Sequence, residues 1–433
     1  MPDESKKSLG IYIHVPFCVR KCGYCGFYSI APRDDAFKEA FEDSFDDAFE
    51  DAFEDAFEDA LEKYAIAVEK QILNGSFLPR REVATFGIDH FDAHQYSVDS
   101  IFFGGGTPSL LSTEYIHKIL NAVDSTFSVE KNAEITIESN PGTLNLEKLR
   151  GYKAAGINRI SLGIQSFNDD ELLQIGRIHD TKTALKTVEL CRKAGFGNLN
   201  LDLIFSLPNQ SFEIWESNLK KAISLSPEHL SIYGLQLEEG TEFFERFNAG
   251  EFDETSDELD RKMYHRTCDI LMDSGFEHYE ISNWAMPGFE CRHNLKYWQF
   301  DEYLGIGPSA ASFVNGFRFE VKPSAKDFIS NYARDMRNAT NAEQRTTLFS
   351  DVHKNTLRDS AGEFAFTALR TPDGISFSKF NAEFGIDFMS FYEKEKTEIE
   401  HFNRLGYIAI DENGIRLTRD GIDVSNSIMA IFV

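Results

Sequence analysis

The chain has 433 residues, 42% of them apolar, and a net charge of −27. The length predicts two or three domains at roughly 150 residues each, and the acidic balance argues against nucleic acid as a partner, because a phosphate backbone requires a basic surface. No apolar run approaches the ~18 residues of a membrane span, and the N-terminal residues lack the apolar core of a signal peptide. We expect a cytoplasmic protein without a transmembrane segment, and leave peripheral membrane contact and oligomeric state open.

Short apolar runs alternate with amphipathic stretches through the first two thirds of the chain. The runs predict strands at 11–15, 100–103, 133–138, 159–163, 198–205 and 229–236. The amphipathic stretches predict helices at 112–122, 145–155, 169–176, 181–194 and 211–224. Such alternation is typical of βαβ units around a parallel sheet. Six units favour an α/β fold with a partial (β/α)6 barrel over residues 1–240, whose ligands lie at the carboxyl ends of the strands.

Residues 34–62 form a low-complexity insertion in this barrel. They hold 14 acids and one lysine, and a Phe or Leu recurs at every fourth position from Phe37 to Leu61. On a helix this spacing winds an apolar stripe slowly round the axis, opposite an acidic face. The pattern predicts a long amphipathic rod that lengthens the first crossover helix by repeat expansion. The alternative is an arm for partner docking or oligomerisation, because spaced Phe side chains form a large apolar patch when exposed.

The pattern changes near residue 322. Helices are expected at 325–345, 359–370 and 388–405, followed at 406–417 by a β-hairpin with an Asn-Gly turn. Helices before a small hairpin predict a smaller winged-helix-like α+β domain over residues 322–433, which serves as a lid or a docking element. Residues 241–321 lie between this domain and the barrel as an extension.

Three of the six cysteines, Cys18, Cys22 and Cys25, form a C-x3-C-x2-C run directly after the first predicted strand. In a reducing compartment, a tight group of cysteines is typical of a metal or catalytic site rather than a disulfide. Four thiolates fully ligate an iron–sulfur cubane, so three leave one iron open to a substrate or cofactor. Zinc normally takes four protein ligands, or three and a water. A [4Fe–4S] cluster is the preferred interpretation, with zinc and plain structural thiols as alternatives.

A glycine triplet, Gly104-Gly105-Gly106, closes the second predicted strand and is followed by Thr107 and Pro108. Successive glycines let a backbone approach a ligand closely and expose its N–H and C=O groups. A phosphate-binding loop is the competing interpretation, but neither a following Gly-Lys-Ser/Thr nor a G-x-G-x-x-G is present. The position of the triplet, at the same sheet edge as the cysteines, supports its interpretation as part of a ligand site.

Together these motifs resemble the radical S-adenosylmethionine (SAM) superfamily. More narrowly, the chain is similar to the branch that contains oxygen-independent coproporphyrinogen III oxidase and the heme chaperone HemW. The resemblance covers nearly the whole chain except the Phe/acidic insertion. The segments that carry it are 12–18, 18–25, 104–108, 138–142, 161–167, 176–179, 200–205, 279–283, 292–298 and 303–308.

The resemblance implies that the three cysteines bind three irons of a [4Fe–4S] cluster, and that SAM chelates the fourth. It also implies that the reduced cluster cleaves SAM to methionine and a 5′-deoxyadenosyl radical, while the protein positions the cofactor. By position, Tyr12 packs on the SAM site. Three residues match the contacts to the methionine end of SAM: Gly105, Gly106 and Thr107. Four more match its polar contacts: Glu138, Gln165, Arg177 and Asp202. Structural ion pairs or strand-end caps are the alternative for each polar residue.

Two functions from different classes stay open within this branch. One is an oxidase of porphyrin biosynthesis that converts coproporphyrinogen III to protoporphyrinogen IX. The other is a chaperone that binds heme and delivers it to acceptor proteins such as respiratory enzymes. The oxidase pattern has a fourth cysteine two residues after the third, where this chain has Phe27, and a longer segment before its cluster. Both features favour the heme chaperone, for which we expect SAM cleavage but no coproporphyrinogen turnover.

His293, in the segment His-Asn-Leu-Lys-Tyr-Trp, matches the family motif that is linked to heme binding. Histidine is a normal axial ligand of heme iron, and the neighbouring aromatic rings can flank a macrocycle. A structural, hydrogen-bonded histidine is the alternative. Two departures concern the pocket: Gly26 replaces an acidic or amide residue, and Ser309-Ala310-Ala311 replaces Gly-Ala-His. A radical SAM enzyme acting on another substrate therefore stays open as a third interpretation.

Overall fold

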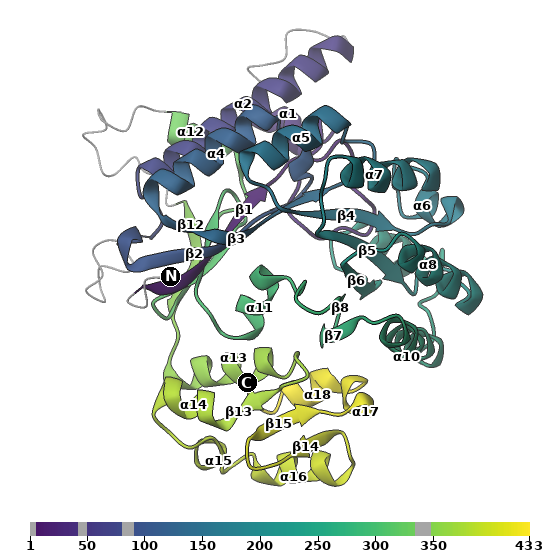
Figure 1. Cartoon of the computed structure of the whole chain (residues 1–433), viewed down its shortest axis with the longest axis vertical. Helices are drawn as coiled ribbons and strands as arrows, with labels where there is room; N and C mark the ends of the chain where they lie inside the picture. The colour runs from purple at the N-terminus through teal and green to yellow at the C-terminus, as the bar shows by residue number, and fades with distance from the viewer. Residues whose placement is uncertain (1–5, 42–49, 80–90, 334–347) are drawn as a thin grey trace.

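The protein is described here by a computed structural model that covers residues 6–41, 50–79, 91–333 and 348–433. A large curved sheet with helices on its outer face forms one body, and a small C-terminal domain faces its concave side (Figure 1). The predicted strands all form and pair in parallel, in chain order. They are β1 (Lys7–Val15), β2 (Tyr96–Gly105), β3 (Ser128–Ser139), β4 (Arg159–Gln165), β5 (Leu199–Phe205) and β6 (His229–Gly234). The expected parallel α/β barrel is therefore confirmed.

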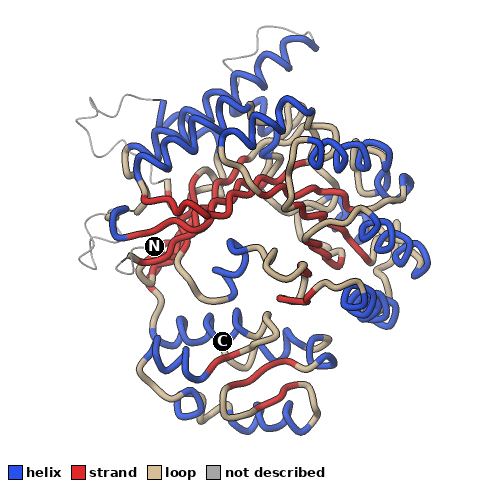
Figure 2. Tube along the Cα trace, viewed as in Figure 1, coloured by secondary structure: helices blue, strands red, loops and turns tan. Residues whose placement is uncertain are grey.

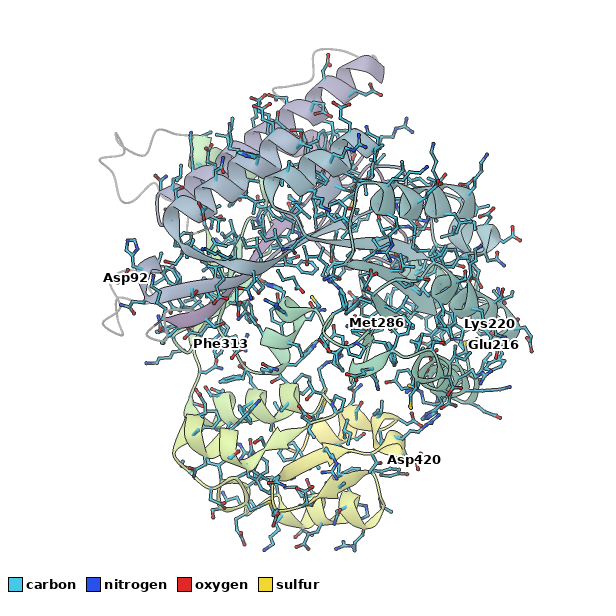
Figure 3. The ribbon with its side chains drawn as sticks, in the orientation of Figure 1. Asp92, Glu216, Lys220, Met286, Phe313 and Asp420 are labelled. Atoms are coloured by element: carbon cyan, nitrogen blue, oxygen red, sulfur yellow. The ribbon has the colours of Figure 1, made fainter. Side chains whose placement is uncertain are left out.

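The crossover helices lie on the outer face of this sheet, where each begins with a side-chain cap. They are α4 (Thr113–Thr126), α5 (Leu146–Ala155), α6 (Asp169–Gln174), α7 (Thr181–Lys193) and α8 (Phe212–Ser224). Ser112 caps α4 by accepting from the backbone N–H of Tyr115, and the helix buries residues at helical spacing, from Ile116 to Val123, against the strands. On the exposed side of α8, Glu216 and Lys220 form an (i, i+4) ion pair (Figure 3).

The two faces of the strands differ in polarity. Residues such as Ile11, Ile137 and Leu201 join the large hydrophobic core. The residues between them are polar or aromatic, as with Glu138 and Asp202, because side chains alternate along a strand. The inner face of the sheet is therefore lined by polar and aromatic side chains, unlike an ordinary apolar core.

Short strands extend the sheet at both edges (Figure 2). Beside β1 run β9 (Tyr303–Ile306), β10 (Ala311–Val314), β11 (Phe317–Val321) and β12 (Phe349–Lys354); beside β6 run β8 (Asn283–Ala285) and β7 (Glu277–Glu280). The helices of this region are α9 (Glu242–Asn248), α10 (Asp257–Asp273), α11 (Arg292–Trp298) and α12 (Ala325–Ala333). Met286, just after β8, donates its N–H to the carbonyl of Glu228 at 2.8 Å and so secures this edge (Figure 3).

The C-terminal domain has the order of elements expected of a winged helix. It contains α13 (Leu357–Ala368), β13 (Ile375–Ser376), α14 (Phe377–Phe384), α15 (Phe388–Phe391), α16 (Lys396–Arg404), β14 (Ile408–Ile410), β15 (Gly414–Leu417), α17 (Arg419–Ile422) and α18 (Ser425–Met429). Its three strands pair in the order β13-β15-β14. The predicted hairpin forms, but its turn differs, because Gly414 is the first residue of β15 and the Asp411 carboxylate accepts the N–H groups of Asn413 and Gly414.

The division between the two bodies lies later in the chain than the sequence suggested. Residues 322–333 and 348–354 belong with the barrel, since Phe328 and Tyr332 of α12 join the large core and β12 pairs with β11. The separate C-terminal core begins with Ala361 of α13. We infer a boundary near residue 355. The part of the expected helix at 325–345 that follows residue 333 lies outside the described residues.

The Phe/acidic insertion is not one continuous rod. The structure has α1 (Asp35–Ala40), which ends at Phe41, and α2 (Glu50–Leu73), which is the crossover from β1 to β2. Phe37 and Phe41 are buried, and Phe57 is half-buried. All three rings pack round Phe17 or its neighbours at centroid separations of 4.8 to 6.3 Å. These residues are core, because their rings turn inward onto Phe17; Phe45, Phe49 and the side chain of Phe53 lie outside the described residues.

Candidate functional site at the carboxyl ends of the strands

The three cysteines lie on a loop that leaves β1 and returns to its end. The Cys18 N–H donates to the carbonyl of Ile30 at 3.0 Å, and the Ile30 N–H donates to that of Pro16 at 2.8 Å. A tighter turn inside the loop is closed by the Cys25 N–H and the carbonyl of Cys22, 3.1 Å apart. All three thiols are free and half-buried, so the loop presents them at the rim of the barrel.

The surroundings of the thiols suit a cluster. Burial by itself disfavours the thiolates that bind iron, since it raises the pKa of Cys18 and raises that of Cys25 to about 11, but two hydrogen-bond donors act in the opposite direction. Arg177 donates to the sulfur of Cys22 at 3.5 Å, and Thr107 donates to that of Cys18 at the same distance. Hydrogen bonds to sulfur are one means by which proteins tune iron–sulfur clusters. Among the described residues, no three Cys, His, Asp or Glu side chains lie close enough together to bind a single metal ion. A cubane does not need such convergence, because each of its thiolates binds a different iron.

The glycine triplet holds the cysteine loop against the end of β2. The Gly106 N–H donates to the carbonyl of Val15 at 2.8 Å, and the Thr107 N–H donates to that of Phe17 at 2.7 Å. A Cβ atom on Gly106 would lie 2.6 Å from the Phe17 carbonyl oxygen, so only glycine permits this approach. The triplet thus positions the loop as well as exposing backbone to a ligand.

Glu138 and Asp202 stand on the interior face of β3 and β5. Burial, reinforced by the charge of Asp202, raises the pKa of Glu138 to about 8, although the Gly105 N–H donates to Glu138 Oε2 at 3.2 Å. Burial also raises the pKa of Asp202, whose carboxylate accepts from Asn200 at 2.7 Å and from Ser161 at 3.1 Å. Two half-buried carboxyl groups with raised pKa values mark a candidate ligand site, where an approaching cation would favour their charged forms.

Arg177 lies between the cysteines and the end of β4. Its Nη2 donates to Asn140 Oδ1 at 2.5 Å and to the carbonyl of Gly163 at 2.6 Å. The Gln165 side chain, on a residue with φ of +67°, lies beside them: a Cβ atom on Gly163 would come within about 3.0 Å of the side chains of Arg177, Asn140 and Gln165. A hollow between this group and the cysteine loop is lined by Val19, Cys22, Thr107, Asn140, Arg177 and His179.

Tyr12 and His293 meet in the interior, away from the cysteine loop. The Tyr12 ring stacks at 6.3 Å on the ring of His293, which lies 5.3 Å from that of Phe102. The Tyr12 hydroxyl bonds to Nδ1 of His14 at 3.1 Å, and burial lowers the pKa of His14 to about 4. Helix α11, which carries His293, lies between the sheet and the C-terminal domain (Figure 1).

His293 is fully engaged with protein groups. Its Nδ1 lies 3.0 Å from the Ser100 hydroxyl and its Nε2 lies 2.9 Å from that of Tyr297. The side chain is buried, and this burial lowers the pKa of His293 to about 3. Ligation of heme iron would require the ring to exchange one of these hydrogen bonds, so the axial role stays a prediction.

The two departures from the family pattern also have structural correlates. A side chain at Gly26 would overlap the carboxylate of Glu238, so an acidic group from another segment fills that space. Ala311, where the family pattern has histidine, is exposed at the start of β10.

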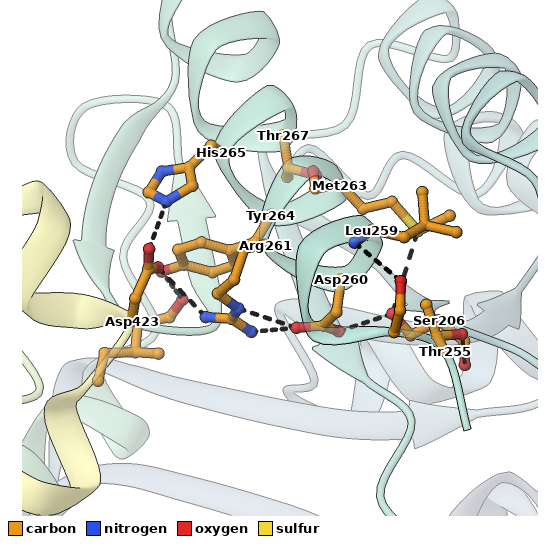
Figure 4. Close-up of polar contacts among 12 residues, drawn as sticks. Ser206, Thr255, Leu259, Asp260, Arg261, Met263, Tyr264, His265, Thr267 and Asp423 are labelled. Atoms are coloured by element: carbon orange, nitrogen blue, oxygen red, sulfur yellow. Dashed lines mark hydrogen bonds and ion pairs between the residues drawn. The ribbon is translucent and has the colours of Figure 1, made fainter.

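A polar chain ties the C-terminal domain to the rim of the barrel (Figure 4). Asp423 accepts from Arg261 at 3.4 Å and contacts His265 Nε2 at 2.8 Å. Arg261 also pairs with Asp260, which accepts from the Ser206 hydroxyl at 2.6 Å, directly after β5. Sequence reasoning missed this link and the bond of Asn140 to Arg177, because each contact joins segments far apart in the chain.

Comparisons with known proteins agree with this geometry. Residues 12–222 match the model of the radical SAM superfamily, and residues 355–424 match that of the HemN C-terminal domain. The heme chaperone HemW of Lactococcus lactis is 30% identical over 430 residues, which cover 99% of this chain and 98% of the relative. HemW of Haemophilus influenzae is 38% identical over 302 residues, which cover 70% and 69% of the two chains.

The structural comparison extends over both bodies. The solved coproporphyrinogen III oxidase HemN of Escherichia coli superposes with a TM-score of 0.75 at 21% identity, over 99% of this chain and 90% of that one. The likeness shows a shared fold. None of the helices that the structure describes has the length and apolar content needed to cross a bilayer. The chain belongs to the HemW and oxygen-independent coproporphyrinogen III oxidase family of the radical SAM superfamily.

Proposed function

We propose that the chain is a heme chaperone-like radical SAM protein that holds a [4Fe–4S] cluster on Cys18, Cys22 and Cys25. The family supports the cluster, and so do the three free, half-buried thiols on one loop with Thr107 and Arg177 donating to sulfur. When bound and reduced, such a cluster supplies an electron to SAM. The role of the chain is to keep the cofactor oriented and away from side reactions.

The polar residues beside the loop are suited to SAM. Backbone of Gly105, Gly106 and Thr107 would hold the methionine end, with Tyr12 packed against the cofactor. Glu138 and Asp202 can accept hydrogen bonds from the ammonium or ribose, and Arg177 and Gln165 can meet the carboxylate. Support comes from the close grouping of Arg177, Gln165 and Asn140 round Gly163, and from the half-buried Glu138 carboxylate beside the Gly105 N–H.

Heme carriage, rather than porphyrin oxidation, is the function that the observations favour. The observation that carries it is Phe27, whose side chain is 68% exposed two residues after Cys25, in place of the fourth cysteine of the oxidase pattern. Relatives named heme chaperone align over nearly the full length of the chain. We further propose that acceptor proteins are its partners and that it acts in the cytoplasm, where its six cysteines stay reduced.

Anaerobic titration of the reconstituted protein with heme, followed by the Soret band, tests this function. We expect saturable binding near one heme per chain. We also expect visible absorption from the cluster in the absence of any substrate. Cys22→Ala should abolish this absorption, whereas Cys268→Ala, which alters a buried thiol on a helix, should retain it. Turnover of coproporphyrinogen without heme binding would replace this proposal with the oxidase. Undiminished iron and sulfide in Cys22→Ala would refute the ligand assignment.

A further inference from the structure

Arg159 is a charged residue at the centre of the barrel that the proposed cofactor sites do not use. It is the first residue of β4, it is 2% exposed, and it pairs in register with Thr136 of β3. Thr136 lies two residues before Glu138, on the same face of β3, so Arg159 faces the interior as well. The charges that act on its pKa are those of Cys291, Glu134, Tyr279 and Asp202.

The Nε of the guanidinium is buried and has no hydrogen-bond partner in the part of the chain that the structure describes. The nearby acceptors are already used. Glu134 accepts from the thiol of Cys291 at 3.4 Å and from the N–H groups of Arg292 and His293 at 3.2 and 3.3 Å. Asp202 accepts from Asn200 and Ser161. The two carboxylates offset the charge of Arg159 from a distance but leave its Nε unbonded.

A buried guanidinium whose Nε is unbonded is costly. Leaving a buried donor without a hydrogen bond is unfavourable, and more so when the group is charged. Its planar fork of five N–H groups matches a carboxylate, which can accept two of them at once. The donors of Arg159 therefore fit an anionic planar group that arrives with a ligand.

The wall beside Arg159 is aromatic. Tyr12 and His293 stack with an interplanar angle of 30°, and Phe102 lies at a similar angle to His293. Tyr12, Phe102, Thr136 and Arg159 stand in register across β1 to β4, so the guanidinium lies in the same row of the interior face as these two rings. The charge of Arg159 also contributes to the lowered pKa of His293, after burial and Lys296. A cation next to flat rings is suited to a flat apolar ligand that bears a carboxylate.

We propose that Arg159 binds a carboxylate of the ligand that enters the barrel beside Tyr12, Phe102 and His293. This inference rests on the proposed function, under which the ligand is heme and the carboxylate is one of its propionates. Arg159 is then a specificity-determining residue that separates carboxylate-bearing tetrapyrroles from neutral ones.

The test compares heme with its dimethyl ester, which has the same ring but no carboxylate. Both are titrated anaerobically, in one detergent buffer, into the reconstituted full chain and into Arg159→Gln and Arg150→Gln. Arg150 is an exposed residue of α5, so its variant loses the same charge without touching the interior. We expect the unaltered protein to bind heme about tenfold to a hundredfold more tightly than the ester, as charged hydrogen bonds predict.

Arg159→Gln should weaken heme binding by that same factor and leave ester binding unchanged, while Arg150→Gln should change neither. Equal affinity of the unaltered protein for heme and ester would overturn the inference, even if Arg159→Gln fails to fold. Equal weakening of both ligands, or weakening of SAM binding alone, would also overturn it. If the unaltered protein binds neither tetrapyrrole, that result refutes the proposed function, and with it this inference.

Discussion

Gly106 joins the end of β2 to the cysteine loop through backbone atoms alone. We predict that Gly106→Ala pushes the loop away from β2, because the added Cβ would meet the Phe17 and Val15 carbonyls at 2.6 and 2.9 Å. The expected effects are a loss of about 2 kcal/mol of stability, typical of overpacking, and a lower iron content after reconstitution. Gly197→Ala is the control, since nothing lies within 4 Å of its added Cβ. Full iron content in Gly106→Ala would contradict this role of the glycine.

Glu138 makes the stability of the cofactor-free protein depend on pH. Its pKa is raised to about 8 in the folded state, chiefly by burial, from 4.5. Its contribution to stability is therefore fully present below pH 4.5 and is lost as pH rises through 8. Between pH 5 and pH 8 we expect a loss on the order of 3 kcal/mol that Glu138→Gln lacks. Urea unfolding of both proteins across this range measures it, and parallel curves would show that Glu138 is ionised when folded.

The residues that sequence alone could place are those at strand ends. Glu138 and Asp202 stand on predicted parallel strands, whose carboxyl ends must meet at one edge, so their proximity follows from the fold. The partners of His293 could not be foreseen, because Ser100 lies on a distant strand and Tyr297 is reached only once α11 forms. Arg159 was overlooked because its significance lies in a donor left unbonded, a property that no local pattern reveals.

At the scale of elements, the four-residue Phe spacing identified the crossover helix but not its break. A four-residue spacing predicts an apolar stripe whether or not the helix is interrupted. The end of α1 at Phe41 depends on packing of this ring against Phe17, a residue that precedes the insertion. The same limit applies to the hairpin of the C-terminal domain, where pairing of Gly414 with Ser376 of β13 moved the turn.

The aromatic group of Phe17, Phe37, Phe41 and Phe57 packs at the start of the cysteine loop, because Phe17 directly precedes Cys18. We predict that Phe41→Ala destabilises the protein by about 3 kcal/mol, as expected for removing a buried aromatic ring, and makes the cluster easier to lose to a chelator. Glu54→Ala, at an exposed position of α2, should change neither property. Unchanged stability and cluster retention in Phe41→Ala would restore the alternative of a free docking arm.

At the scale of the whole molecule, the C-terminal domain contacts the barrel through ion pairs and through an apolar contact in which Ile281 and Phe300 pack against its core. Arg318 pairs with Glu363 at 2.7 Å, Arg419 with Asp269 at 2.7 Å, and Arg370 with Glu280 at 3.2 Å. The Arg370 guanidinium also lies 4.4 Å over the ring of Trp298, on the helix that carries His293. Interfaces that include several ion pairs are typical of domains that can move relative to one another, and movement here would expose α11.

We predict that Arg370→Ala loosens this interface. It would leave Glu280, whose side chain is fully buried, without its cation, at a cost of about 3 kcal/mol. Hydrogen exchange in α11 should then accelerate, whereas Arg404→Ala, which removes an exposed pair on α16, should leave it unchanged. Unaltered exchange in both variants would show that the domain does not cover α11.

Heme transfer is the property that separates a carrier from an enzyme. The measurement is the rate at which heme-loaded, cluster-reconstituted protein passes heme to an apo b-type cytochrome at increasing cytochrome concentrations. We predict a rate that rises with acceptor concentration and exceeds spontaneous heme release, because the two proteins must meet for transfer. A rate that equals spontaneous release at every concentration would contradict heme delivery by this protein.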